Sequence, residues 1–309
     1  MRSVLFFCFL IFIVYILIVI AGILMPLTTQ LPIYVESTNL RFESYPERPI
    51  KHCTLVGTHG SAAYRLDVEK LVDDRNVGIK KFGYLIQNFT RRWAINQQFS
   101  LYDQLTMGVR FLHLEISLYQ DEWCTIHSYK AGTLKEDLLD ILRFVAVSGS
   151  THFTLLHPQL FGDQDRDSAG KTYMDEMEEI LGSSLRVYTP DDPVNTYYNT
   201  VAVIQSPPLY PRDYTDDIDI FLHNRNKVVP PGTFLQWVMT PDNTTIVRNI
   251  FLPFITTNSL SDLYPTKHTH LFKYLQSHEP LRVQCIIVDH VDPQFVSIID
   301  NLCLVEIKR

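Results

Sequence analysis

The sequence has no dense run of lysine and arginine, and its 34 acidic residues outnumber its 27 basic ones, giving a net charge of −7. Nucleic-acid binding usually requires a basic patch, so this balance argues against a nucleic-acid partner. Beyond residue 50 the sequence also lacks glycine/serine linkers, internal repeats and low-complexity segments. An uninterrupted stretch of roughly 260 residues is close to the size of one (β/α)8 barrel. With 46% hydrophobic and 20% charged residues, the composition is that of a folded globular protein.

Several catalytic and cofactor motifs are also missing. The sequence contains no G-x-S-x-G, no P-loop and no G-x-G-x-x-G, which argues against a hydrolase nucleophile elbow and against nucleotide binding. It has no His-x3-His or Cys-x2-Cys spacing, which disfavours zinc. The nearest candidate, Lys267-His268-Thr269-His270, precedes an ordinary amphipathic segment and is interpreted as a solvated turn.

The segment from Val4 to Leu24 contains no charged residue, follows Met1-Arg2 and is long enough to form an apolar helix. With a rise of about 1.5 Å per residue, such a helix can cross a hydrocarbon core of about 30 Å. A cleavable signal peptide processed at Ala21-Gly22 is the alternative, but its apolar region is usually shorter. We expect an uncleaved signal-anchor over residues 1–25, a polar stalk over 26–50 and a barrel domain over 51–309.

The position of Arg2 predicts a single-pass membrane protein with its barrel on the extracellular or lumenal side. Sequons at Asn88 and Asn243 are compatible with a glycoprotein in that compartment. Four cysteines follow the anchor, and in an oxidising compartment they allow two disulfides. The alternative, which we favour for at least one pair, is that they are small buried apolar residues. The four are Cys53, Cys124, Cys285 and Cys303.

Short apolar runs alternate with amphipathic stretches along the rest of the chain, which favours parallel βαβ units and a distorted (β/α)8 TIM barrel. Thr133 and Glu136 form a capping-box pattern before a helical apolar face that starts at Leu134. Gly182 has the position of a C-cap after a helix over 174–181.

Ionisable residues recur where these apolar runs end. "CTLVGT" leads into His59, "WCTI" into His127, "FTLL" into His157 and "QCIIV" into Asp289. In "VRFLHLEI", period-2 alternation places His113 and Glu115 on one face of a strand and Arg110 on the other. Barrel enzymes have their active sites at the carboxyl ends of the strands. Two histidines at such a rim are suited to general acid–base catalysis, because an imidazole both accepts and donates protons near neutral pH.

The segments that carry these residues are similar to the phosphatidylinositol-specific phospholipase C X-domain family, in particular its stand-alone branch. They are "VGTHGSAAYRLD", "WAINQQFSLYDQLTMGVRFLHLEIS", "CTIHSYKAGTLKEDLLDILRFV", "FTLLHPQLF", "LQWVMTP" and "CIIVDHVDPQFVSIIDNL". The resemblance spans most of residues 53–304. It implies a distorted barrel that cleaves phosphatidylinositol or glycosyl-phosphatidylinositol in a membrane, by attack of the inositol 2-hydroxyl on phosphorus.

By this resemblance His59 is the general base and His127 the general acid, with Glu115 and Asp289 as further catalytic residues. Arg110, His113, His157 and Trp237 are then the expected substrate-binding residues.

The chain departs from the family at Gly60, where an Asp or Asn is usual, and at His113 and Glu115, where the stand-alone pattern has Asp and Arg. The calcium-dependent pattern has an acidic ligand at the position of Glu115. The cofactor therefore stays open, with a divalent cation such as calcium as one candidate.

A carboxylate beside a phosphodiester opposes the charge of the transition state, whereas a positive partner stabilises it. If the protein is an enzyme, we expect a cation or a protonated His113 to compensate for Glu115. The alternative function is an inactive X-domain that binds lipid headgroups or a protein partner.

Overall fold

The computed structural model describes residues 46–72, 92–147, 151–162, 164–210, 232–238, 268–271, 273 and 283–307, together with residues 12, 13 and 16. Across these ranges no helix has both the length and the apolarity needed to cross a membrane. Most of Val4–Leu24 and both sequon asparagines, Asn88 and Asn243, lie outside the described residues. The signal-anchor, the stalk and the glycosylation therefore stay predictions.

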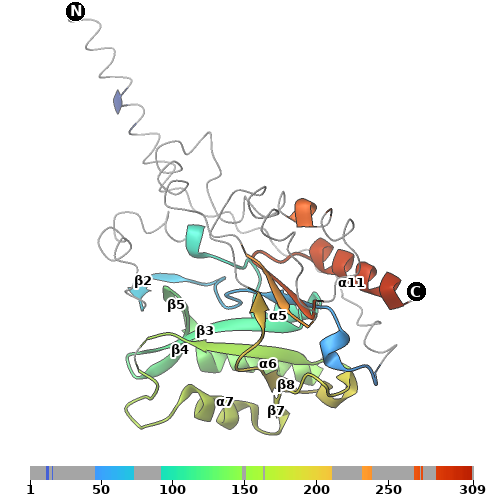
Figure 1. The fold of residues 1–309 in the computed structure, drawn as a ribbon. Helices are drawn as coiled ribbons and strands as arrows, with labels where there is room; N and C mark the ends of the chain where they lie inside the picture. Colours follow the sequence, from blue (N-terminus) through green and yellow to red (C-terminus); the bar gives the residue numbers. More distant parts are fainter. Residues whose placement is uncertain are drawn as a thin grey trace, which may run out of the picture.

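Eight strands form a row of parallel neighbours, in which the first and last strands of the chain are adjacent (Figure 1). The spatial order is β9–β10–β11–β1–β3–β6–β8–β7. Within the described residues, β7 and β9 are the two ends of this row, so closure of the barrel stays a prediction while the mixed α/β fold is confirmed. The strands are β1 (Leu55–Thr58), β3 (Phe111–Tyr119), β6 (Thr154–Leu160), β7 (Leu185–Val187), β8 (Val201–Val203), β9 (Leu209–Tyr210), β10 (Phe234–Trp237) and β11 (Cys285–Val288).

Helices cover the outside of this sheet. In Figure 1, α6 and α7 lie together on one side of the molecule and α11 lies on another. The predicted capping box is present, since Glu136 N donates to Thr133 Oγ1 at 3.1 Å and Thr133 N donates to Glu136 Oε2 at 3.2 Å. Gly182 ends α7 with a φ of +49°, a left-handed conformation that glycine adopts without strain. The helices are α5 (Leu101–Thr106), α6 (Leu134–Val147), α7 (Tyr173–Leu181) and α11 (Pro293–Ile307), with 3-10 turns η1 (Ile50–His52), η2 (Gly182–Ser184) and η3 (Val194–Tyr197).

A hairpin extends the sheet beyond the parallel row. The run ending at His127 departs from the expected parallel βαβ units: β4 (Glu122–His127) pairs antiparallel with the second half of β3. The reason is the two-residue connection, Gln120-Asp121, whose φ angles of 52° and 62° are those of a tight type I′ turn. A parallel partner would need a crossover of a dozen or more residues. Two antiparallel strands, β5 (Tyr129–Thr133) and β2 (Asp67–Leu71), continue from β4.

Alternation along the strands divides the apolar side chains between two cores. One core packs the sheet against the helices and includes Leu112, Leu114 and Leu156. The other includes Leu55, Phe111, Leu155, Phe234 and Cys285, which lie on the opposite side of the same strands.

Gly57 belongs to this second side. A Cβ at this position would lie 2.7 Å from Cys285 Sγ and 2.9 Å from Phe111 Cδ1, closer than packed atoms approach. The missing side chain lets the strands close over this core.

The segment before β1 is attached to the domain. Ile50 is fully buried and its N–H donates to the carbonyl of Asp192 at 3.0 Å, while Asn195 N donates to Pro46 O at 3.0 Å. Residues 46–50, predicted as the end of a stalk, therefore pack against the domain. Cys53, Cys124 and Cys285 are thiols, the last two buried, and the Cys303 side chain lies outside the described residues.

A buried carboxylate joins α6 to the hairpin. Asp137 Oδ1 accepts from Arg65 Nη2 at 2.6 Å, and its Oδ2 accepts from Thr125 Oγ1 at 2.5 Å. Thr125 is two residues before His127, so this contact helps to position the end of β4. Burial raises the pKa of Asp137 to about 6, although Arg65 and Thr125 act in the opposite direction.

This raised pKa predicts that the difference in unfolding free energy between wild type and Asp137→Asn depends on pH. Well below pH 4 the carboxyl is protonated in both the folded and the unfolded protein; as the pH rises toward about 6 the unfolded chain releases its proton first, and the folded state loses relative stability. Urea unfolding should show wild type losing about 2 kcal/mol relative to Asp137→Asn between pH 4 and pH 7. A difference between the two proteins that does not change with pH would contradict the buried carboxyl.

Candidate active site

Charged and polar side chains gather at the carboxyl ends of the parallel strands, on the same side of the sheet as the inner apolar core. Neighbouring strands contribute them in register: Phe111 pairs with Leu155, then His113 with His157, then Glu115 with Gln159. Along β3, in steps of two residues, the inward side chain changes from apolar Phe111 to ionisable His113 and then Glu115. The rim is therefore a polar layer above an apolar one, as the alternation of β3 predicts.

His59 follows β1 and is only 2% exposed. Its Nδ1 lies 2.9 Å from Asp289 Oδ1, at the end of the adjacent strand β11. A carboxylate only accepts hydrogen bonds, so we assign the ring proton to Nδ1 and the lone pair to Nε2. Among the residues that the structure describes, His59 Nε2 has no hydrogen-bond partner. This is the arrangement of a base oriented by a carboxylate, which leaves Nε2 as the basic nitrogen.

The sequence analysis missed two buried amides that support this pair. Asn96 Nδ2 lies 2.8 Å from both Asp289 Oδ1 and His59 Nδ1, and we assign it as a donor to the carboxylate. Gln97 Nε2 donates to the backbone carbonyls of His59 at 3.0 Å and Val288 at 3.1 Å, so one amide holds both strand ends. Both amides lie in the segment "WAINQQFS", which carried the family resemblance but no strand-end signal.

Gly60 has a φ of +49°, and a Cβ there would lie 3.3 Å from the Asn96 side chain. The Asn96 amide thus occupies the space beside residue 60, where the family usually has an Asp or Asn. A polar group therefore lies at this place, and it comes from a different part of the chain.

His127 is brought to the same rim by the antiparallel return of β4. Its ring centroid lies 6.0 Å from that of His59, with the two rings nearly perpendicular. His127 Nδ1 lies 2.8 Å from the backbone carbonyl of Ala94, which accepts its proton and leaves Nε2 as the nitrogen that can face a ligand. His127 is half-buried, whereas His59 is enclosed.

His113 and His157 continue the cluster along the rim. The ring of His113 stacks on that of His59 at 5.2 Å and on that of His157 at 5.3 Å. His113 Nε2 lies 2.7 Å from Gln159 Oε1, and Gly60 N–H points to Nδ1 at 3.5 Å. These contacts describe a neutral His113 with its proton on Nε2. His157 Nδ1 donates to Ile204 O at 2.9 Å, and burial lowers the pKa of His157.

Glu115 is 7% exposed, and its Oε1 lies 3.8 Å from His59 Nε2. Ligand atoms of His59, His113 and Glu115 all lie within 4.8 Å of one another. Calcium takes six to eight oxygen ligands. Two imidazoles and one carboxylate do not provide them, so these residues do not fit the calcium ion that the sequence left open.

Two residues expected to bind substrate are placed elsewhere. Arg110 Nη1 donates to the carbonyls of Leu105 at 2.7 Å and Val109 at 2.6 Å, and its guanidinium lies over the ring of Phe144. Trp237 ends β10 and is fully buried in the core beneath the helices. The structure therefore does not bring Arg110 into the histidine cluster, and the substrate-binding roles of both residues stay predictions.

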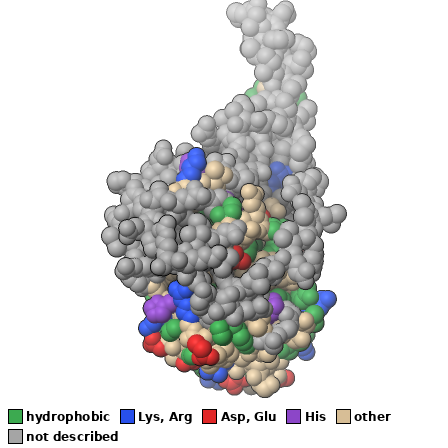
Figure 2. Space-filling view, turned by 90° about the vertical axis from the view of Figure 1, so that its right-hand side faces the viewer, with side chains coloured by type: hydrophobic (Ala, Val, Ile, Leu, Met, Phe, Trp, Pro, Cys, Tyr) green, Lys and Arg blue, Asp and Glu red, His purple; other side chains and the backbone are tan. Residues whose placement is uncertain are grey.

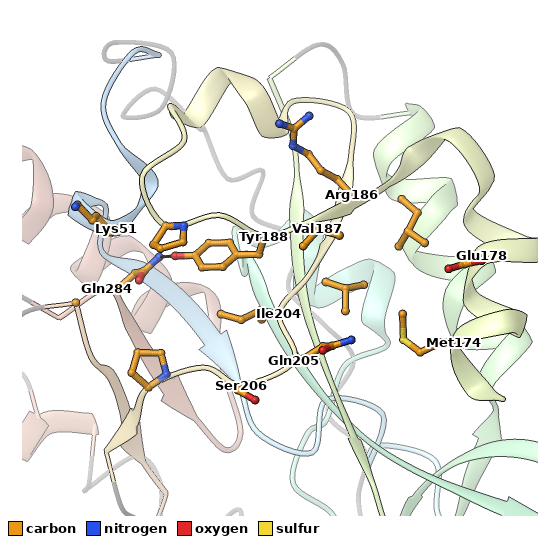
Figure 3. A pocket seen from close by; sticks show the side chains of 15 residues that line it. Lys51, Met174, Glu178, Arg186, Val187, Tyr188, Ile204, Gln205, Ser206 and Gln284 are labelled. Atoms are coloured by element: carbon orange, nitrogen blue, oxygen red, sulfur yellow. Dashed lines mark hydrogen bonds between the residues drawn. The ribbon is translucent and has the colours of Figure 1, made fainter. Parts of the chain in front are cut away.

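A cavity of about 570 Å³ lies apart from the histidines. It lies where the parallel row is open, between β7 and β8 on one side and the residues before β9, β10 and β11 on the other. Figure 3 shows Tyr188 and Gln284 hydrogen-bonded at one end of this cavity, with Met174 and Glu178 of α7 at the other.

Elsewhere on the described surface, Figure 2 shows acidic and basic side chains interspersed over its lower part.

Comparison with known proteins shows what the chain is similar to in sequence and fold. No protein-family model matches the chain. A PI-PLC X-box domain-containing protein of Dictyostelium discoideum is 28% identical over 141 residues, which are 46% of this chain and 18% of that protein. Among solved structures, the phosphatidylinositol-specific phospholipase C of Listeria monocytogenes has a TM-score of 0.56 at 13% identity, covering 83% of this chain and 95% of that one. The Staphylococcus aureus enzyme has a TM-score of 0.54 at 13% identity, covering 83% and 97%. The resemblance stated from the sequence is confirmed, and the structures show a shared fold.

The assigned proton on His59 Nδ1 gives a prediction that does not depend on activity. Long-range ¹H–¹⁵N spectra should show that the uncharged ring of His59 is protonated at Nδ1. Asp289→Leu should remove this preference because the acceptor is lost. His127, whose proton is held by Ala94 O, should keep its tautomer in the variant and serves as the internal control. A His59 protonated at Nε2 in wild type would show that Asn96 donates to Nδ1 instead.

Proposed function

We propose that this protein, which resembles the phosphatidylinositol-specific phospholipase C X-domain family in sequence and in fold, is a phosphodiesterase acting on phosphatidylinositol-type lipids. The observation that carries the proposal is the Asp289–His59 pair with His127 beside it. Each of the two histidines has its Nδ1 held by a protein acceptor, so each can present Nε2 to a ligand. One imidazole can take a proton while the other gives one, as displacement at phosphorus requires.

In the proposed reaction His59 Nε2 takes the proton of the inositol 2-hydroxyl, whose oxygen attacks phosphorus. The bond from phosphorus to the glyceryl oxygen breaks, and His127 in its doubly protonated form gives its Nε2 proton to the departing oxygen, while its Nδ1–H stays on Ala94 O. The products are an inositol cyclic phosphate and diacylglycerol. Asp289 stabilises the imidazolium that forms on His59, because its carboxylate accepts the proton on Nδ1 at 2.9 Å.

Glu115 opposes this reaction. Its carboxylate is buried 3.8 Å from the proposed base, so a phosphodiester in contact with His59 meets a second negative charge. In the contacts described, His113 is neutral and Arg110 is held by backbone carbonyls away from the cluster. We therefore expect turnover slower than that of a site with a positive group at this position.

Glu115 also supports the second candidate function, a binding scaffold for lipid headgroups or a protein partner. Removal of the charge separates the two. In the enzyme, Glu115→Gln removes the repulsion while keeping the side chain's shape. In a scaffold it changes no turnover, because none exists.

We further propose that the domain lies on the extracellular or lumenal side of a membrane, anchored by Val4–Leu24. Expression in animal cells followed by glycosidase treatment tests this, because Asn88 or Asn243 carries a glycan only after translocation. A downward shift in gel mobility that is lost in the Asn88→Gln, Asn243→Gln double variant supports the topology. Domain residues accessible to protease on the cytosolic side of intact membranes would contradict it.

The catalytic proposal is tested on vesicles containing phosphatidylinositol, with release of inositol phosphate as the readout. We expect slow turnover by wild type, a loss of about 100-fold or more in His59→Ala and in His127→Ala, and a gain of about tenfold in Glu115→Gln. His52→Gln, at an exposed histidine of η1, is the matched control and should act like wild type. Absence of turnover in both wild type and Glu115→Gln, with both folded, would favour the scaffold.

A further inference from the structure

We propose that His59, His113 and Glu115 form a binding site for a first-row transition-metal ion of the zinc type, and that the bound ion blocks the base of the phosphodiesterase. All three side chains are buried, and one ligand atom of each lies within 4.8 Å of the others. Two imidazole nitrogens and one carboxylate oxygen are a donor set that zinc uses with an open fourth position. Hard cations such as calcium and magnesium prefer oxygen.

The hydrogen bonds around the cluster orient both histidines for this role. A metal-bound histidine usually donates its other ring N–H to a carboxylate, a carbonyl or a water molecule. His59 has its Nδ1 proton on Asp289 Oδ1 at 2.9 Å, which directs the lone pair of Nε2 inward. His113 has its Nε2 proton on Gln159 Oε1 at 2.7 Å, which leaves Nδ1, 3.5 Å from Gly60 N, as the nitrogen that would ligate after giving up this long contact. The two rings would then ligate through different nitrogens.

Independent of the clustering, the His59 nitrogen itself points to a ligand. Nε2 is buried and has no hydrogen-bond partner among the described residues, and Glu115 Oε1 lies 3.8 Å away. A buried acceptor without a partner is destabilising. A cation between Nε2 and Oε1 satisfies the nitrogen and neutralises the carboxylate at once.

The spacing needs a small adjustment. Ligand atoms of a tetrahedral zinc ion with bonds of about 2.0–2.1 Å lie about 3.4 Å apart. The 3.8 Å between His59 Nε2 and Glu115 Oε1 is close to this value, and the group as a whole lies within 4.8 Å. Side-chain rotations that bring the ligand atoms closer together would complete the site.

Binding of this ion has a consequence for the proposed function, on which this second half of the inference rests. The lone pair of His59 Nε2 cannot accept the 2-hydroxyl proton while it is bound to a metal. Zinc should therefore inhibit phosphatidylinositol cleavage, and a chelator should restore it. The same ion would add positive charge beside the phosphate, but without a base the displacement does not start.

The metal site is tested without substrate. The full-length chain is stripped with a chelator and titrated with Co²⁺ in chelator-free buffer, and the visible absorption of the bound ion is recorded before displacement by Zn²⁺. We expect one Co²⁺ per chain. Glu115→Gln and His113→Gln should weaken binding by about 100-fold or more, and Gln159→Leu by about 10–100-fold because the orientation of His113 is lost.

Two histidine variants serve as controls. His127→Gln removes the proposed acid and not a ligand, so it should abolish turnover and keep Co²⁺ affinity. His52→Gln removes an exposed histidine and should change neither. Circular dichroism checks that each variant is folded, and if His113→Gln is not, Gln159→Leu and Glu115→Gln carry the test.

The outcomes separate this inference from the proposed function. Absence of bound Co²⁺ in the folded wild type, or affinity unaffected by Glu115→Gln, would overturn the metal site whether or not the protein turns over lipid. Co²⁺ bound with the expected variant pattern in a protein without turnover would support the metal site and leave the phosphodiesterase refuted. Cleavage that continues undiminished at saturating Zn²⁺ would overturn the inhibition.

Discussion

The hydrogen bond between His59 and Asp289 joins the first and last strands of the described sheet across 230 positions of sequence. It holds β1 against β11 at their carboxyl ends, and it selects which nitrogen of His59 keeps a lone pair. Gln97 reinforces the same junction by donating to carbonyls on both sides. The chemistry of the rim therefore depends on how these two strand ends meet, since a shift of either one would release the imidazole and the amides together.

Glu115 determines whether the lone pair of His59 Nε2 is better suited to act as a base beside a phosphodiester or to bind a cation. Beside a phosphodiester its charge is unfavourable, and beside a cation it is a ligand, so a single carboxylate pulls the site toward metal binding and away from phosphate. The stacked imidazoles of His59, His113 and His157 strengthen this tendency, because neutral nitrogen donors are in excess of positive side chains in the cluster. The residues of this site therefore suit metal binding and phosphate binding more equally than the residues of a site with a single positive partner for phosphate would.

Part of this arrangement was predictable from strand periodicity. The alternation in β3 placed His113 and Glu115 on one face, and the apolar runs before His59, His157 and Asp289 identified them as rim residues. His127 was identified from a strand that was expected to pair in parallel and pairs antiparallel instead. An apolar run does not reveal the direction of its neighbour. Asn96, Gln97 and Gln159 were missed, since buried amides have no periodic signal. Zinc was disfavoured because spacing rules detect ligands that are close in sequence, whereas the ligands proposed for a metal ion come from the ends of two strands.

The hairpin that delivers His127 also limits how this segment can change in evolution or engineering. Its turn, Gln120-Asp121, has two residues, and side chains along β4 alternate between faces. If an inserted residue entered β4 while the turn kept its two residues, the register would shift by one and His127 would move to the opposite face, whereas an insertion absorbed by a longer turn would leave it in place. The number of β4 residues between this turn and His127 is therefore a condition for keeping the proposed acid at the rim.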